Sequence, residues 1–259
     1  MTQDILEQVM KLSREVGAFL LEQTVSDAQI EAKSMNNLVS FVDQTAERMF
    51  VEGLQEILPE AGFIAEEGSA SHNDEEYLWV IDPLDGTTNY IHGIPAFCTS
   101  VGLLKNRKSI MGVIYDPCRD EMFSALLGKG AFLNGKPIQV SHRNSLKSSV
   151  LATGFPYDDF DRQDQYMELF GDLCKSSRGL RRWGSAAIDM AWVAVGRFEG
   201  FYEYGLNPWD IAAGVIIVEE AGGQVDAFTP SHDAIFDREI VATNGLIQQE
   251  LLAKVGEYF

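Results

Sequence analysis

Apolar and polar residues at the start of the chain recur with the period of an α-helix. Residues 3–23 place apolar side chains three or four positions apart, which predicts an amphipathic helix: Ile5, Leu6, Val9, Met10, Leu12, Val16, Phe19 and Leu20. A second helix is predicted over residues 43–58, where Pro59 stops it.

Short apolar runs bounded by Gly, Asn or Pro follow, and each predicts a strand. Before residue 140 these runs lie at residues 62–67, 77–83, 96–104, 109–117 and 121–128. After residue 145, two strands and three helices are predicted, at residues 148–154, 163–174, 185–195, 198–204 and 211–221. Because the order is not strictly βαβ, we predict an α+β fold rather than a doubly wound parallel sheet. We expect one compact unit made of two halves, residues 1–140 and 141–259.

Composition and charge narrow the function. The 259 residues are 46% hydrophobic, as in an ordinary globular protein with a large core. With 20 Lys and Arg against 39 Asp and Glu, the formal net charge is −19. This acidity argues against nucleic-acid binding, which relies on cationic contacts to phosphates. An anionic substrate stays compatible with it, because bound divalent cations reverse a local field.

Two further patterns bear on the compartment. No apolar run reaches the roughly 18 residues of a membrane span, and charges interrupt the N-terminal segment, so we expect neither an anchor nor a signal peptide. Cys98, Cys118 and Cys174 lie far apart without a CxxC pair. We therefore expect a reduced, cytoplasmic protein.

The segment YLWVIDPLDGTTNY, residues 77–90, delivers two carboxylates into a turn. Pro83 keeps Asp82 extended, so the strand continues to this point or ends there. Asp85, Gly86 and Thr87 then predict a tight turn, in which Gly allows a ligand to approach the backbone. If a helix follows, the amides of Gly86 and Thr87 face outward at its positive end, an arrangement that suits phosphate.

Acidic residues end two more apolar runs, Glu66 and Glu67 in GFIAEEGS and Asp210 in NPWDIAAG. Taken singly, Asp210 is a helix N-cap and the Glu pair a solvated strand end. Three such segments together predict a site for a hard cation such as magnesium, which takes oxygen ligands from several carboxylates.

These motifs together resemble the inositol monophosphatase family of lithium-sensitive, magnesium-dependent phosphatases. The resemblance runs through most of the chain and rests on GFIAEEGS, WVIDPLDGTTNY and NPWDIAAGVIIVEEAGG. It implies a layered α-β-α-β-α sandwich, of the type shared with fructose-1,6-bisphosphatase, and a homodimer. It also implies in-line attack of a metal-activated water on a phosphate monoester, with myo-inositol monophosphate as the expected substrate.

The resemblance assigns metal ligands. Glu66, Asp82 and the carbonyl of Leu84 would hold a first Mg²⁺, and Asp82, Asp85 and Asp210 a second. A third, weaker ion would rest on Glu66.

It also assigns roles around the substrate. Thr87, oriented by Asp43, would position the attacking water together with Glu66, and the amides of Gly86 and Thr87 would bind the phosphate. The residues matching contacts to the inositol hydroxyls are Asp85, Ser185, Ala186 and Glu203.

Alternatives remain at three levels. Relatives within the superfamily act on fructose 1,6-bisphosphate, 3′-phosphoadenosine 5′-phosphate or histidinol phosphate, although TNY after DGT resembles the inositol branch. Aspartyl-nucleophile phosphatases carry DxDGT, but two residues separate the aspartates here, which changes the strand register. A regulatory protein that keeps the fold is a third option, because some bacterial relatives join transcription complexes. Its contact would be Arg178, Arg181 and Arg182, which we interpret instead as a solvated or dimer-facing patch.

Overall fold

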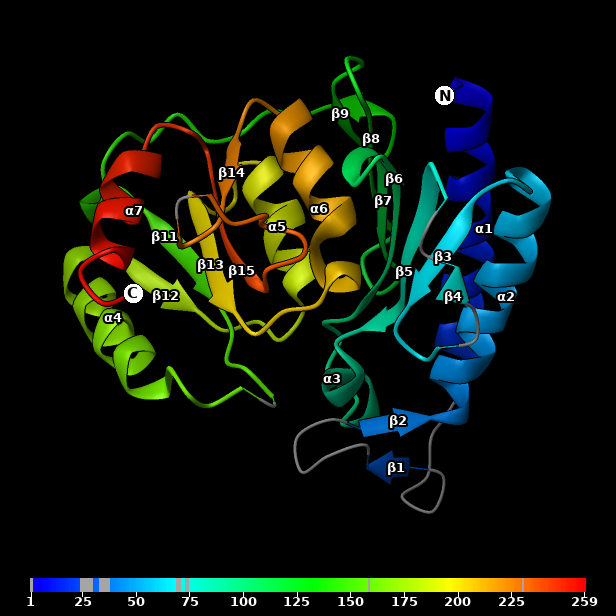
Figure 1. Cartoon of the computed structure of the whole chain (residues 1–259), viewed down its shortest axis with the longest axis horizontal. Coiled ribbons are helices and arrows are strands. Elements are labelled where there is room, and N and C mark those ends of the chain that lie inside the picture. Colours follow the sequence, from blue (N-terminus) through cyan, green and yellow to red (C-terminus); the bar gives the residue numbers. More distant parts are fainter. Residues whose placement is uncertain are drawn as a thin grey trace.

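The computed structural model describes residues 2–23, 30–32, 38–68, 71–72, 75–157, 159–229 and 231–259. Within these ranges the strands form an eight-stranded sheet, a five-stranded sheet and a two-stranded pair, called here the large sheet, the small sheet and the hairpin. Helices cover both outer faces and fill the space between the two sheets (Figure 1). The predicted α-β-α-β-α layering is confirmed.

The large sheet is antiparallel except where β3 runs parallel to β5. Its strands, in spatial order, are β10 (Lys136–Pro137), β9 (Ala131–Leu133), β8 (Glu121–Leu126), β7 (Lys108–Asp116), β6 (Cys98–Lys105), β5 (Tyr77–Asp85), β3 (Gly62–Ala65) and β4 (Ser71–His72). Its outer face packs against α1 (Gln3–Glu22) and α2 (Phe41–Ile57).

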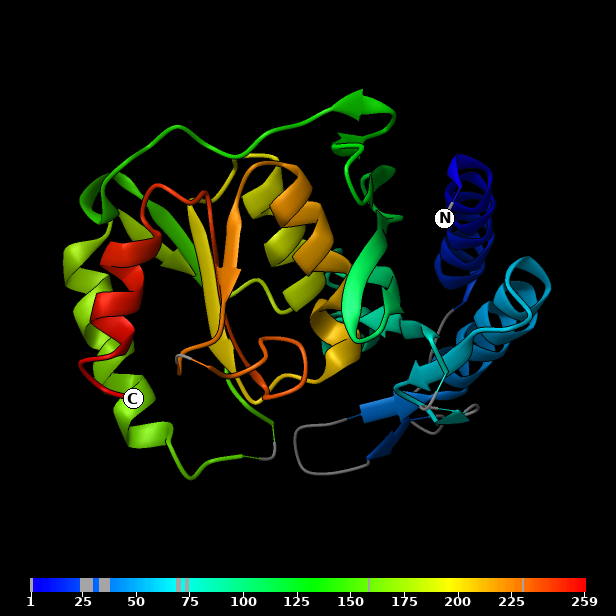
Figure 2. The same cartoon turned by 45° about the horizontal axis from the view of Figure 1, so that its top comes forward.

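The small sheet is mixed, because β11 runs parallel to both of its neighbours. Its strands, in spatial order, are β12 (Gly179–Arg181), β11 (Val150–Thr153), β13 (Gly200–Tyr204), β15 (Glu239–Thr243) and β14 (Gln224–Asp226). On its outer side α4 (Gln163–Ser176) and α7 (Gln248–Val255) lie next to each other (Figure 2). A 3₁₀ helix, Leu146–Ser148, precedes this sheet.

The middle layer consists of α5 (Ala186–Ala194) and α6 (Pro208–Glu220), which pack on each other and on both sheets. Residues 211–218 of α6 are all buried, as expected for a helix that is apolar on every face. Two strand glycines let α6 approach the large sheet: a Cβ at Gly112 would lie 2.4 Å from the carbonyl oxygen of Ala213, and one at Gly102 would lie 3.0 Å from the Cβ of Ala212. Ser109 of β7 donates a hydrogen bond to the carbonyl of Ala212 over 2.8 Å.

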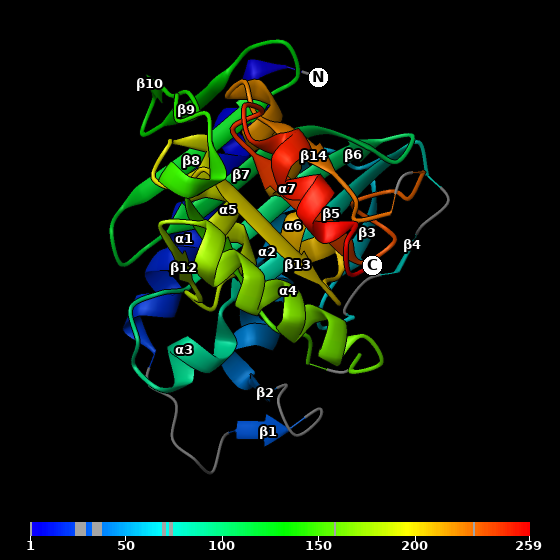
Figure 3. The same cartoon turned by 90° about the vertical axis from the view of Figure 1, so that its left-hand side faces the viewer.

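The remaining elements are short. The hairpin strands β1 (Ile30–Ala32) and β2 (Leu38–Ser40) pair antiparallel, and β2 lies beside α3 (Thr87–Ile91) (Figures 1 and 3). No helix in the described part of the chain is long and apolar enough to cross a membrane.

Each element that the sequence predicted is observed to within a few residues, but several were not predicted, among them β12, β14, β15 and α7. One predicted strand is also longer than expected. The strand expected at residues 77–83 continues through Pro83 to Asp85. The large sheet is built before residue 140 and the small sheet after it, but one hydrophobic cluster joins Val80, Ile216 and Phe201 from the large sheet, α6 and the small sheet. The division into halves at residue 140 stays a prediction.

Candidate active site

The carboxyl end of β5 carries an irregularity that brings two aspartates to the same pocket. Asp82 pairs with Ser100 and Asp85 pairs with Cys98. Three residue steps along β5 therefore lie opposite two residue steps along β6. Side chains three apart on a regular strand point to opposite faces, and the extra residue of a bulge corrects this. Both Asp82 and Asp85 line the pocket. This is why the strand runs past Pro83: the bulge tolerates a residue without an N–H.

Gly86 makes the turn from β5 into α3. Its φ of +95° lies in the left-handed region that favours glycine, and a Cβ there would lie 2.8 Å from the carbonyl oxygen of Ala96. Asn89 of α3 reinforces the turn, because its Nδ2 donates to the carbonyls of Ala96 at 2.8 Å and Trp183 at 3.0 Å. The turn is therefore fastened to the segment that begins α5.

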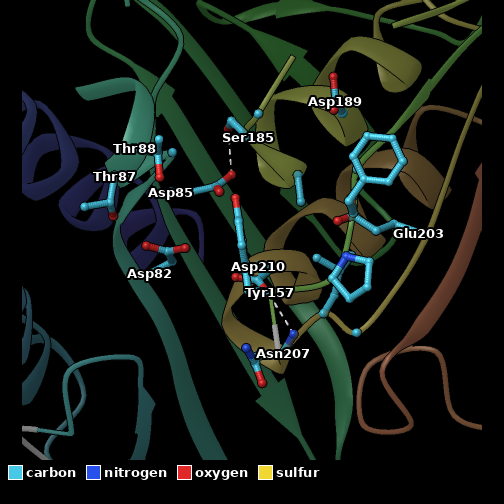
Figure 4. A pocket seen from close by; sticks show the side chains of 18 of the residues that line it. Asp82, Asp85, Thr87, Thr88, Tyr157, Ser185, Asp189, Glu203, Asn207 and Asp210 are labelled. Atoms are coloured by element: carbon cyan, nitrogen blue, oxygen red, sulfur yellow. Dashed lines mark hydrogen bonds between the residues drawn. The ribbon is translucent and has the colours of Figure 1, made fainter. Parts of the chain in front are cut away.

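The pocket opens between the large sheet and the small sheet. Figure 4 shows Asp82, Asp85 and Thr87 on one side, Asp210 in the middle, and Asp189 and Glu203 on the other side. Of the residues that the sequence predicted, all but one line this pocket: Glu66, Asp82, Leu84, Asp85, Gly86, Thr87, Ser185, Ala186, Glu203 and Asp210. The exception, Asp43 of α2, lies behind the lining and contacts Thr87.

Thr87 is held by two acceptors. Its Oγ1 lies 3.1 Å from Asp43 Oδ1 and 3.0 Å from the carbonyl oxygen of Leu84. A hydroxyl has one proton, so it donates to one of these acceptors at a time and keeps lone pairs to accept a further hydrogen bond.

Asp85 is fixed from the side of α5. Its Oδ2 accepts from Ser185 Oγ at 2.6 Å and from the backbone amide of Ala187 at 2.7 Å. Ser185 is also the N-cap of α5, because its Oγ accepts from the amide of Ile188. The start of α5 thus orients a carboxylate that belongs to β5.

Asp210 sits in the first turn of α6, not at the N-cap position that its sequence context suggested. The N-cap is Asn207, and Asp210 is the third helical residue of a capping box. Its Oδ2 accepts from the amide of Asn207 at 2.6 Å. This role leaves the other oxygen of Asp210 available to a ligand.

Glu66 follows β3 and is half-buried at the edge of the pocket. The next residue, Glu67, donates its backbone amide to Oε2 of the buried Glu47 on α2, over 2.6 Å. That bond ties the end of β3 to α2, the helix that also supplies Asp43.

Three carboxyl groups of the pocket have raised pKa values. Burial raises the pKa of Asp82 well above its usual range, and the negative charges of Glu66, Asp85 and Asp210 raise it further. Burial also raises the pKa of Asp85 to about 6, although its bonds from Ser185 and Ala187 oppose this. The pKa of Asp210 is raised by burial and then by the charge of Asp85. A bound cation would relieve all three shifts.

The donor set fits a hard metal ion in its chemistry, since it consists of carboxylate and carbonyl oxygens. The side chains are not drawn together into a finished centre: in the described ranges, no three His, Cys, Asp or Glu side chains form a group ready to hold a metal. The carboxylate oxygens accept hydrogen bonds from protein groups: Asp82 accepts from the amide of Leu84 at 2.9 Å, and Asp85 accepts from the hydroxyl of Ser185.

Several pocket residues were given no role in the site by the sequence analysis, among them Tyr157, Arg182 and Asp189. Arg182 is not simply part of a surface patch with Arg178 and Arg181, because it lines the pocket. Asp189 gave one signal that was overlooked, since it follows Ala186 by three residues and so shares its helix face. Nothing in the sequence pattern marks Tyr157.

Comparison with known proteins identifies the family of this chain. The chain matches the sequence model of the inositol monophosphatase family over residues 1–258. It is 44% identical over 236 residues to inositol-1-monophosphatase of Synechocystis sp., covering 89% of this chain and 82% of that protein. It is 39% identical over 260 residues to Nus factor SuhB of Pseudomonas aeruginosa, covering 98% and 96%.

A solved structure shows the same fold. The extragenic suppressor protein suhB from Bartonella henselae superimposes with a TM-score of 0.93 at 34% identity, covering 99% of this chain and all of that one. The chain therefore belongs to the inositol monophosphatase family of metal-dependent phosphatases.

Proposed function

We propose that this phosphatase hydrolyses a phosphate monoester of a polyol with Mg²⁺ as cofactor, and that myo-inositol monophosphate is its substrate. One observation carries the proposal: Glu66, Asp82, Asp85 and Asp210, from three distant segments, line one pocket next to the Gly86 turn. The name of the Synechocystis relative supports the choice of substrate.

The residues that would hold magnesium follow from the donor set. Glu66, Asp82 and the Leu84 carbonyl would take one ion and Asp82, Asp85 and Asp210 a second, with a third on Glu66. Bound magnesium supplies charge neutralisation for the phosphoryl group and lowers the pKa of coordinated water. Positioning and charge neutralisation are the main requirements of phosphoryl transfer.

Thr87 and Asp43 would orient the attacking water. When the Leu84 carbonyl is used by a cation, the Thr87 hydroxyl donates its proton to Asp43, which lies 3.1 Å away. The oxygen of Thr87 is then an acceptor for a proton of the water. Glu66, at the same edge of the pocket, is the second acceptor for that water. The amides of Gly86 and Thr87 would bind the phosphoryl oxygens.

The other end of the pocket would receive the leaving group. Ser185, Ala186 and Glu203 line it and offer a hydroxyl, a backbone amide and a carboxylate to the ring hydroxyls. The homodimer and the lithium sensitivity that the family resemblance implies, and the cytoplasmic location expected from the cysteine pattern, are parts of the same proposal.

A second candidate function rests on a different observation. The relative called Nus factor SuhB aligns over 98% of this chain, which suggests a partner in the transcription machinery. Arg178 and Arg181 are exposed and offer charge for such a contact. Recovery of RNA polymerase on the immobilised chain, together with absence of phosphatase activity, would favour this function over catalysis.

A phosphate-release panel tests the main proposal. The purified chain is assayed with inositol 1-phosphate, fructose 1,6-bisphosphate, 3′-phosphoadenosine 5′-phosphate and histidinol phosphate, with Mg²⁺, with chelator and with added lithium. We expect the largest kcat/KM with inositol 1-phosphate, complete loss with chelator, and recovery when Mg²⁺ is restored. Undiminished hydrolysis in chelator would rule out the metal mechanism, and a better rate with another ester would reassign the substrate.

A further inference from the structure

A single cationic side chain faces the pocket. Among the described residues that line it, Arg182 is the sole Lys or Arg. Its Nη2 lies 3.4 Å from the hydroxyl oxygen of Tyr157, a long contact. A guanidinium has five N–H donors, so this contact leaves donors for a ligand.

Arg182 lies close to the turn proposed to bind phosphate. Gly184, with φ +93°, has no side chain, and a Cβ there would lie 2.8 Å from Arg182 Nη1. On its other side, the carbonyl oxygen of Gly184 lies 3.3 Å from where a Cβ of Gly86 would be. The guanidinium therefore sits beside the backbone that packs against the Gly86 turn.

Two buried carboxylates surround the guanidinium on the leaving-group side. Burial raises the pKa of Glu203 to about 8, and the charge of Arg182 opposes that rise. Asp189 is equally enclosed, and its Oδ1 has no hydrogen-bond partner among the described residues. This end of the pocket thus combines one rich donor with carboxylate acceptors.

This combination favours one class of leaving group. A second phosphate near Arg182 would also lie beside the carboxyl groups of Asp85, Asp189 and Glu203, and each of these repels an anion when it is ionised. An alkyl or aryl group would leave the buried carboxyl groups of Asp189 and Glu203 without hydrogen-bond partners, which is costly. Two adjacent hydroxyls on the leaving group would satisfy both kinds of group, because one hydroxyl donates to a carboxylate and its neighbour accepts from the guanidinium.

We propose that Arg182 is a specificity-determining residue that, paired with Glu203 across the pocket, selects monophosphate esters whose leaving group carries a vicinal diol. The inference rests on the proposed phosphatase function and deepens it: Arg182 would donate to the hydroxyl next to the ester, and Glu203 would accept from the following one.

The test compares two esters in three variants. Arg182→Gln removes the charge, Arg182→Lys keeps it without the planar fork, and Arg181→Gln is a matched control, because Arg181 is the adjacent exposed arginine and does not line the pocket. Each is assayed with inositol 1-phosphate and with phenyl phosphate, which has no hydroxyl on its leaving group. Thermal melting confirms that each variant is folded.

We expect Arg182→Gln to lower kcat/KM for inositol 1-phosphate by about 10- to 100-fold, mainly through KM, and for phenyl phosphate by about 3-fold or less. Arg182→Lys should fall between wild type and Arg182→Gln, and Arg181→Gln should match wild type. Equal losses on both esters would overturn the proposal. A further assay with fructose 1,6-bisphosphate would also overturn it if Arg182→Gln lost more activity there than on inositol 1-phosphate, because Arg182 would then bind a second anion. Wild-type protein inactive on both esters would instead refute the proposed function.

Discussion

The two ends of the pocket are built in different ways. The phosphate end comes chiefly from one continuous stretch, residues 82–88, in which a strand, a bulge and a glycine turn set the side chains. The leaving-group end is assembled from residues 153–157, 182–189 and 203–206, which lie on separate elements. At the phosphate end, the local backbone geometry fixes the positions of all the side chains together. At the leaving-group end, each contact comes from a different element and can change without the others. Substitutions should therefore affect all substrates at the first end and discriminate among substrates at the second.

Asp82→Asn provides the largest expected effect at the phosphate end. It removes the charge that two proposed metal sites share, so kcat should fall at least about 10³-fold for every substrate, or about 4 kcal/mol. The fold should persist, because Asn can still accept from the Leu84 amide. Phosphate release and circular dichroism measure the two properties, and Asp164→Asn on the exposed face of α4 is the control. Substantial magnesium-dependent turnover in Asp82→Asn would contradict the assignment.

Glu203→Gln probes the leaving-group end through stability. Because the folded state raises the pKa of Glu203 from 4.5 to about 8, the folded protein holds a proton that the unfolded chain loses. Protonated Glu203 therefore contributes a free energy of folding that is fully present below pH 4.5 and is lost as pH rises through about 8. The neutral Gln side chain avoids that loss. In chelator, Glu203→Gln should gain up to about 5 kcal/mol over wild type at pH 9 and little at pH 4.5.

Urea unfolding across pH measures this, and Glu239→Gln is a control of opposite sign. Burial would raise the pKa of Glu239, but hydrogen bonds from Thr229 and Arg162 outweigh it and hold the pKa below its usual range. Its stabilisation is therefore present above the unfolded pKa, so Glu239→Gln should be less stable than wild type at pH 7. A gain for Glu203→Gln that did not depend on pH would contradict this account.

Gly86→Ala gives the smallest of the three effects and tests the local geometry of the phosphate end. At φ +95°, an added Cβ meets the Ala96 carbonyl at 2.8 Å, so we expect a loss of about 3 kcal/mol in the free energy of unfolding. Gly128→Ala is the matched control, because Gly128 has φ +74° but no atom within 4 Å of the added Cβ. Strain alone should cost Gly128→Ala about 1 kcal/mol. Equal losses in chemical unfolding would mean that the close packing of the Gly86 turn contributes nothing.

The same contrast explains what the sequence could reveal. Asp82, Asp85, Gly86 and Thr87 lie within six positions, so strand, proline and turn rules predicted their convergence. The bulge was not predictable, because it depends on how Ser100 and Cys98 of the neighbouring strand pair with β5. Arg182 and Tyr157 meet only through the packing of a loop on the turn before α5, and no periodicity encodes that contact.

Asp210 shows a further limit. Its place before an apolar helix suggested an N-cap, but the competing Asn207 takes that role and moves Asp210 into the first turn. Either residue is a good N-cap, so local propensity could not decide between them. Pro208, at the first helical position, favours the observed start.

The glycines of β6 and β7 that lie under α6 indicate where inactivating mutations would arise. Asp210 reaches the pocket because Gly102 and Gly112 let its helix settle close to the large sheet. A methyl group at Gly112 would force that helix outward and carry Asp210 away from β5. Inactivating alleles are thus to be sought not only among the acidic residues but also at two glycines that bear no chemistry, where a genetic screen would find loss of function without any altered reactive group.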